Sequence, residues 1–192
     1  MKTIEDVAQK KNSGSVLIVA PRSVEKLAES ANNIRKLAKA SGHLDKHYLD
    51  IAGFFERLSG KLPDSFQFHV AEARDFPDHT YEGLTFPDGQ ILIHENVYDG
   101  AHEGKGRDRF TMTHELQHWV LHRNEFAWAR SSTNMKVFKD PEWQANTGAS
   151  LTLMSLKSVE KFSGDVEQLA DACGVSVPAA EARMRIHSKH GF

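Results

Sequence analysis

Apolar residues recur at steps of three and four along two stretches in the first third of the chain. From Ser23 to Ala40 this spacing places the apolar side chains on one face of a helix, with Ser23 as its N-cap. A second helix is predicted over residues 49–58 by the same criterion. The sequence therefore predicts a helical N-terminal part over 20–60.

The apolar period changes to two after Pro63, which is typical of β-strands. Residues 66–70 alternate between apolar and polar side chains, and 83–98 are predicted as a hairpin with a Pro-Asp-Gly turn at 87–89. A loop rich in glycine and charge follows over 99–106. These segments predict a small antiparallel sheet.

Helical spacing returns over 107–122, and again from Asp140 to Leu156, where Asp140 is the expected N-cap before Pro141. Two short helices are expected in the tail, over 165–173 and 178–187. Helices, then strands, then helices indicate an α+β fold.

A chain of 192 residues fits one domain. We expect a core over about 62–158, preceded by the helical part and followed by a tail over 164–190. With Gly174 at its turn, this tail has the two-helix pattern of a helix-turn-helix unit.

Composition narrows the functional classes. The formal net charge of -2 gives no global basic field for nucleic acid or an anionic membrane. The single cysteine, Cys173, excludes an intrachain disulfide and is expected to pack as a small apolar residue. The apolar run from Val16 to Ala20 is far too short to span a membrane, so a cytoplasmic protein is the default expectation.

Histidine is the unusual residue, with eleven in the chain and five between His94 and His122. His114, Glu115 and His118 form an H-E-x-x-H motif on the predicted helix 107–122. Histidines four apart lie one turn above each other, so both imidazoles can bind one zinc ion. Glu115 is offset by about 100° and misses the ion, but it can take a proton from a water beside it. The alternative is a helix whose histidines bind no metal.

A catalytic zinc needs a third protein ligand. His122 shares the helix face but lies about 12 Å from His114 along the axis, so we interpret it as a packing residue or one that orients a ligand. Glu142 can reach the ion from the next helix, and Asn146, four residues on, can orient a ligand histidine. A solvated glutamate at a helix start is the open alternative for Glu142. Two other glutamates are poorer candidates, Glu125 and Glu160.

These residues resemble the ImmA/IrrE family of metallopeptidases. The resemblance covers roughly Phe66 to Leu156, and more faintly the tail, through the segments DGQILIHENV, RFTMTHELQHWVLH and EWQAN. The family pattern Glu-x-x-Ala-Asn/Asp matches Glu142, Ala145 and Asn146 and favours Glu142 as the third ligand. The resemblance implies a zincin-like fold with a small antiparallel sheet packed against the H-E-x-x-H helix.

The resemblance also implies an activity, namely zinc-dependent, site-specific cleavage of a helix-turn-helix repressor that controls stress-response or mobile-element genes. The chain departs from the family pattern at three places. Gln117 replaces a usual glycine, an aromatic residue is missing near Gly148, and Ser155 replaces a proline. These positions affect packing and leave the ligands in place.

Other roles remain open in the sequence. Tyr98, Tyr81 and His94 are candidates for stabilising the transition state, and the strand 90–97 is a candidate edge for an extended peptide. One alternative function is a metal-holding module that binds a repressor or antitoxin without cutting it. Another is a DNA-binding regulator that uses the tail, where Arg183, Arg185 and Lys189 are the basic residues. The oligomeric state and the cleavage site are left open.

Overall fold

The computed structural model describes residues 15–76, 80–123, 127–130 and 136–192. It has an α+β fold, as predicted. The helices are α2 (Val24–Ala40), α3 (Ile51–Lys61), α4 (Glu95–His102), α5 (Gly106–His122), α6 (Pro141–Leu153), α7 (Leu156–Lys161), α8 (Val166–Cys173) and α9 (Val177–His190). The strands are β1 (Ser15–Ile18), β2 (Leu44–Asp45), β3 (Tyr48–Leu49), β4 (Gln67–Ala71), β5 (Gly83–Thr85), β6 (Gln90–His94) and β7 (Ala127–Arg130). Short 3-10 turns are η1 (Ala73–Asp75) and η2 (Val137–Lys139).

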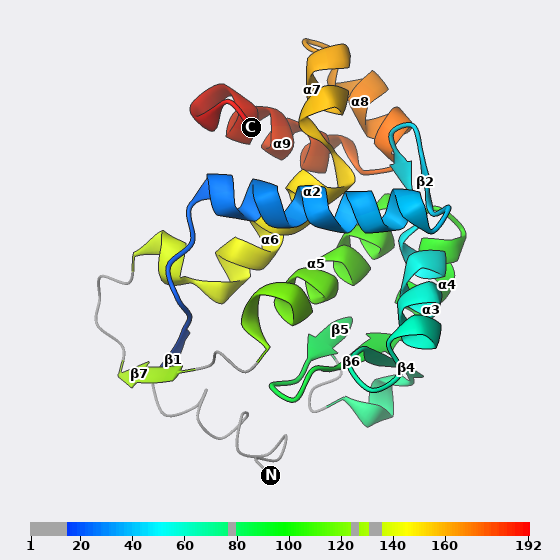
Figure 1. Cartoon of the computed structure of the whole chain (residues 1–192), viewed down its shortest axis with the longest axis vertical. Coiled ribbons are helices and arrows are strands. Elements are labelled where there is room, and N and C mark those ends of the chain that lie inside the picture. The colour runs from blue at the N-terminus through cyan, green and yellow to red at the C-terminus, as the bar shows by residue number, and fades with distance from the viewer. Residues whose placement is uncertain (1–14, 77–79, 124–126, 131–135) are drawn as a thin grey trace.

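Figure 1 shows how the layers are arranged, with α7, α8 and α9 at one end and the sheet of β4, β5 and β6 at the other. Helices α2 and α5 cross the middle. In the described ranges of the chain, no helix combines the length and the apolar composition needed to cross a membrane.

The predicted N-terminal helices are confirmed, with small changes at their ends. The Ser23 side chain accepts a hydrogen bond from the Lys26 backbone N–H at the start of α2. Helix α3 begins later than predicted, at Ile51, because the Asp50 side chain caps it by accepting from the Gly53 N–H at 3.1 Å.

The three-stranded sheet has the order β4-β6-β5. The predicted hairpin is confirmed for β5 and β6, which pair antiparallel across a turn in which Gly89 has a φ of 92°. The expectation of an entirely antiparallel sheet is wrong, because β4 pairs with β6 in parallel. Strand β6 is central and its Ile91 and Ile93 are fully buried.

The idea that strand 90–97 offers an edge to a peptide is therefore wrong. Strand β6 is bonded on both sides, and the edge strand of this hairpin is β5. The predicted hairpin also ran too far, because 95–102 form helix α4, where a loop was expected from 99. The His94 side chain caps this helix by accepting from the Asn96 N–H at 3.1 Å. Val97, Gly100 and Ala101 are buried at helical spacing.

The helix predicted from Asp140 to Leu156 is two helices. Helix α6 ends at Leu153, and the Ser155 side chain accepts from the Ser158 N–H to begin α7. Ser155 stands where the family pattern has proline, so both residue types mark the same helix boundary.

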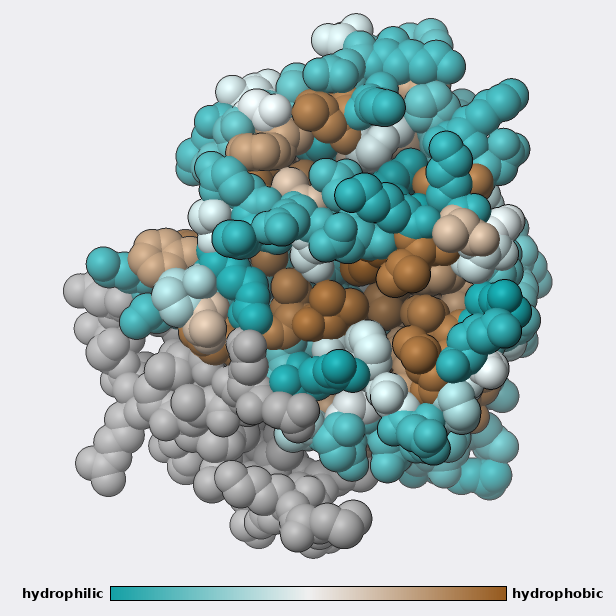
Figure 2. Space-filling view, in the orientation of Figure 1, coloured by the Kyte–Doolittle hydropathy of each residue, from teal (hydrophilic) through white to brown (hydrophobic). Residues whose placement is uncertain are grey.

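The core lies around α5. Met112 and Leu116 of α5 are almost completely buried and belong to the same apolar cluster as Phe55 and Phe66. In Figure 2, apolar side chains gather across the middle of the face, between α2 and the sheet. The apolar side chains of this cluster pack densely against α5 and thus fix its position.

Buried arginines fix the helices that carry the site. Arg109 of α5 donates to the carbonyl oxygens of Leu49 at 2.7 Å, of Cys173 at 2.9 Å, and of Gly174. Arg35 of α2 donates to Thr152 O at 2.7 Å, and Arg183 of α9 donates to Met154 O at 2.8 Å. These guanidinium groups bind carbonyls at the ends of α6 and α8, which lack partners within their helices.

Candidate metal centre

Helix α5 brings His114 and His118 together, as their spacing predicts. Their ring centroids lie 4.6 Å apart, and the two Nε2 atoms are separated by 2.9 Å. Both side chains are mostly buried, being 15% and 11% exposed. Two imidazoles thus turn the same nitrogen toward one point.

Glu142 reaches that point from the first turn of α6. Its Oε2 lies 3.3 Å from His114 Nε2, and its Oε1 lies 3.5 Å from His118 Nε2. The helix start is fixed by Asp140, whose side chain accepts from the Glu142 N–H at 2.9 Å, and by Pro141 in the first turn. The predicted cap therefore aims the predicted third ligand.

The three side chains fit a small divalent cation. Ligand atoms about 2.0–2.1 Å from a tetrahedral zinc lie roughly 3.3 Å from one another. The separations of 2.9, 3.3 and 3.5 Å between the two Nε2 atoms and the Glu142 oxygens bracket that value. Two imidazoles and one carboxylate are a usual donor set for a catalytic zinc.

The charges of the cluster are coupled. Hydrogen bonds from His114 and His118 hold the pKa of Glu142 far below its usual range. Burial lowers the pKa of His114, but the hydrogen bond to Glu142 and the nearby carboxylates outweigh burial, so the net shift is upward. The ionised Glu142 thus provides the negative charge that a bound cation needs.

Further polar groups orient the two imidazoles. The Oδ1 of Asn146 lies 2.9 Å from His114 Nδ1, which is the contact expected from the sequence. On the other ring, His118 Nδ1 lies 3.0 Å from Nδ1 of His122, and His122 Nε2 lies 3.0 Å from Gln144 Oε1. Burial lowers the pKa of His122 to about 4, so its ring is neutral near pH 7. His122 thus contacts a candidate ligand, as predicted.

Glu115 is held by the edge strand of the sheet. The Thr85 hydroxyl donates to Glu115 Oε2 at 2.7 Å. A Cβ added at Gly83 would lie 2.8 Å from Glu115 Cγ, so the carboxylate passes directly over this glycine. Neither Thr85 nor Gly83 is predicted from the sequence. Their signal, a glycine and a threonine two apart in a strand before the H-E-x-x-H helix, is too common to be specific.

The weaker candidates have partners elsewhere. The Tyr98 hydroxyl donates to Glu56 Oε1 at 2.5 Å, and burial with this contact raises the Tyr98 pKa to about 12. His94 caps α4, and its ring stacks on Phe76 at 5.9 Å. Tyr81 is half-buried just before β5. Their roles as transition-state stabilisers stay predictions.

Of the two poorer candidates for the third ligand, Glu160 does not join the cluster. Glu160 is exposed on α7, whereas the cluster of potential metal ligands is His114, His118 and Glu142. Glu125 lies outside the described residues.

Two departures from the family pattern compensate each other. Gln117, in place of a usual glycine, is fully buried and donates to Thr152 Oγ1 at 2.8 Å. A Cβ at Gly148 would lie 2.6 Å from Gln117 Oε1. The larger side chain on α5 therefore occupies space that a small residue on α6 leaves open.

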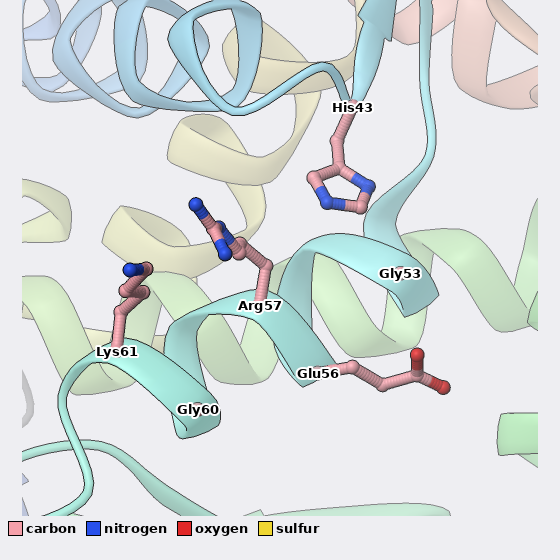
Figure 3. A pocket seen from close by; sticks show the side chains of 6 residues that line it. All are labelled: His43, Gly53, Glu56, Arg57, Gly60 and Lys61. Atoms are coloured by element: carbon pink, nitrogen blue, oxygen red, sulfur yellow. The ribbon is translucent and has the colours of Figure 1, made fainter.

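A separate surface pocket lies along α3 (Figure 3). His43, Glu56, Arg57 and Lys61 line it together with two glycines, Gly53 and Gly60. In the view of Figure 3 the Glu56 side chain points away from Arg57 and Lys61. The Glu56 carboxylate accepts from the Tyr98 hydroxyl and lies 3.3 Å from His102 Nε2, so it binds two residues of α4.

An α+β fold that brings an H-E-x-x-H helix together with a glutamate of a following helix defines a zincin-like peptidase. The family model of the IrrE N-terminal-like domain, Peptidase_M78, matches residues 69–185, and the chain belongs to this peptidase family. The family is in general zinc-dependent, which agrees with the His-His-Glu cluster. No match was found among the curated proteins compared with the chain.

Proposed function

We propose that the chain is a zinc-dependent endopeptidase that cleaves a helix-turn-helix repressor and so regulates stress or mobile-element genes. In this proposal His114, His118 and Glu142 bind the zinc, and Glu115 is the general base. The observation that carries it is the convergence of three ligand atoms, all within 4.8 Å of one another, two of them from the helix that bears Glu115 and one from α6.

The residues divide the hydrolysis between them. When bound, zinc polarises a carbonyl and acidifies water. Glu115 takes the proton of the attacking water and passes it to the nitrogen of the leaving amine, so one water is consumed and a carboxylate and an amine are formed. Thr85 holds Oε2 of Glu115 during this transfer, and Asn146 holds the ring of His114.

The proposed substrate is an extended segment of a protein. Strand β5 is at the edge of its sheet, and its Thr85 contacts Glu115. An extended peptide that adds to this edge would place its main chain beside the general base. That the substrate protein is a repressor is inferred from the resemblance of this chain to the ImmA/IrrE family.

The direct test is Glu115→Gln, which removes the base and keeps the shape. Helix-turn-helix proteins encoded beside the gene serve as probes and are incubated with the zinc-loaded wild type and the variant. Intact-mass spectrometry then reads cleavage, and elemental analysis reads zinc. We expect the variant to keep its zinc and lose cleavage by about 100-fold or more.

The other outcomes identify the alternatives. Binding of a repressor that is equally strong in both proteins, without cleavage by either, would favour a metal-holding module. The DNA-binding alternative has lost one of its basic residues, because Arg183 is fully buried and bonded to Met154 O. Cleavage that survives Glu115→Gln would contradict the assigned base.

A further inference from the structure

The proposed metal ligands come from two helices, so their geometry depends on how these helices lie against each other. Helix α5 provides His114 and His118, and the first turn of α6 provides Glu142. A metal ion requires its ligand atoms at fixed distances, to within about 0.2 Å. Residues that hold the end of α5 to the start of α6 therefore take part in forming the site.

Arg22 joins these two helices through its guanidinium group. Nη2 donates to Leu121 O at 2.7 Å, in the last turn of α5. Nη1 donates to Gln144 Oε1 at 3.3 Å, in α6. Leu121 is three residues after His118, and its helix ends one residue later. Gln144 is two residues after Glu142. One planar group thus bonds both helices within one turn of a proposed metal ligand.

The guanidinium is itself held in place by its own main chain and by the Gln144 amide. The Arg22 N–H donates to Phe138 O at 3.1 Å, in the 3-10 turn just before α6. The fully buried Gln144 donates from Nε2 to Ala20 O at 2.9 Å and to Phe138 O at 2.8 Å. Because both oxygens only accept, the amide must turn its Oε1 the other way, where Arg22 donates to it.

We propose that Arg22 is a positioning residue of the metal centre, which sets the distance between His118 and Glu142 by bonding the end of α5 to the start of α6. This inference rests on the metal site of the proposed function. It assigns part of that site to a residue outside the 69–185 region that the family model matches.

A second arginine binds α6 at its other end and provides the matched control. Arg35 of α2 is buried and donates to Thr152 O at 2.7 Å and to Leu153 O at 3.4 Å. Thr152 is ten residues after Glu142, which is about 15 Å along the helix. Loss of the Arg35 guanidinium should therefore lower the stability of the fold and leave the ligand geometry unchanged.

The test replaces each arginine by methionine, which keeps an unbranched side chain and removes the guanidinium. Zn²⁺ affinity is measured by competition with a chelator, and stability by chemical denaturation of the metal-free protein. We expect Arg22→Met to weaken zinc binding by about tenfold or more, as for other groups that orient metal ligands. Loss of a positive charge alone would strengthen the binding of a dication, so weaker binding separates positioning from electrostatics. Arg35→Met should bind zinc as the wild type does.

Coordination geometry is the second measurement, read from the visible absorption of protein loaded with Co²⁺ in place of Zn²⁺. We expect Arg22→Met to change this spectrum and Arg35→Met to leave it as in the wild type. Arg22→Lys keeps the charge, but its ammonium lacks the planar fork that reaches two acceptors. The zinc affinity of Arg22→Lys should therefore lie between those of the wild type and Arg22→Met.

The outcomes separate this inference from the proposed function. Zinc affinity and a cobalt spectrum that are the same in Arg22→Met and Arg35→Met would overturn the inference and leave the peptidase proposal standing, as would tighter zinc binding by Arg22→Met. If Arg22→Met does not fold, Arg22→Lys decides in its place, and wild-type affinity in that variant would overturn the inference. A wild type whose zinc affinity depends on Arg22, but which cleaves no repressor, would overturn the proposed function alone.

Discussion

The hydroxyl of Thr85 lies 2.7 Å from Oε2 of Glu115 and donates to it, so the edge strand β5 and the H-E-x-x-H helix are joined at the proposed base. The carboxylate would otherwise turn about its side-chain bonds. The contact thus places one oxygen of Glu115 and leaves Oε1 for the water.

Thr85→Val keeps the shape of the side chain and removes this hydrogen bond. A hydrogen bond to a charged group stabilises by about 1.5–3 kcal/mol, and about 1.4 kcal/mol corresponds to a tenfold change in rate. We expect kcat to fall by about tenfold with zinc affinity unchanged, measured by steady-state cleavage and chelator competition. Thr111→Val, one turn before Glu115 on α5, is the control, because its hydroxyl donates to the Arg107 carbonyl oxygen within the same helix. Equal kcat in the two variants would contradict a role for Thr85.

Gly83→Ala tests the same carboxylate by steric contact. The new Cβ would lie 2.8 Å from Glu115 Cγ, which is closer than real contacts allow, so the side chain must move. We expect kcat to fall by about tenfold or more while the metal stays bound. The control is Gly60→Ala in α3, where a Cβ has nothing within 4 Å and the helix gains up to about 1 kcal/mol. Full activity of Gly83→Ala would show that Glu115 does not depend on this approach.

Tyr98→Phe removes a hydroxyl that is bonded to Glu56 at 2.5 Å. We expect cleavage to be unchanged, because the hydroxyl joins α4 to α3 through Glu56. The free energy of unfolding should fall by about 1 kcal/mol when this hydrogen bond is lost. Chemical denaturation and steady-state kinetics measure the two effects. A loss of kcat at unchanged stability would restore Tyr98 as a transition-state stabiliser.

Cys173 reports the opening of the helical end of the molecule. It is fully buried, as expected from the sequence, and burial raises the pKa of its thiol. Little thiolate therefore forms as the pH rises toward 9, and a thiol reagent must wait for the structure to open. We expect native labelling to be at least about 100-fold slower than labelling in guanidinium. Equal rates would mean that α8 does not pack as described.

The chemistry was predictable from sequence because it depends on short spacings. His114 and His118 face one point because four residues make about one helical turn, and the N-cap Asp140 precedes Glu142 by two residues at the start of α6. These relationships are local. Pattern alone left Glu142 undecided, and the resemblance to a family favoured it.

The parts that sequence analysis missed depend on contacts between distant residues. Thr85 meets Glu115 thirty positions away, and Gln144 meets Ala20 across more than a hundred. The spacing of apolar and polar residues along the chain does not indicate such distant pairs. Helix α4 was predicted as strand and loop because histidine is a rare N-cap, although Val97 and Ala101 keep helical spacing.

Metal content is the most direct test of the His-His-Glu centre. Protein purified without chelators is assayed by elemental analysis beside His118→Ala, Glu142→Ala and, as a control on an exposed glutamate, Glu160→Ala. We predict one zinc per chain in the wild type and in the control, and loss of zinc in the other two. A wild type without stoichiometric metal, or zinc retained in His118→Ala, would contradict the account.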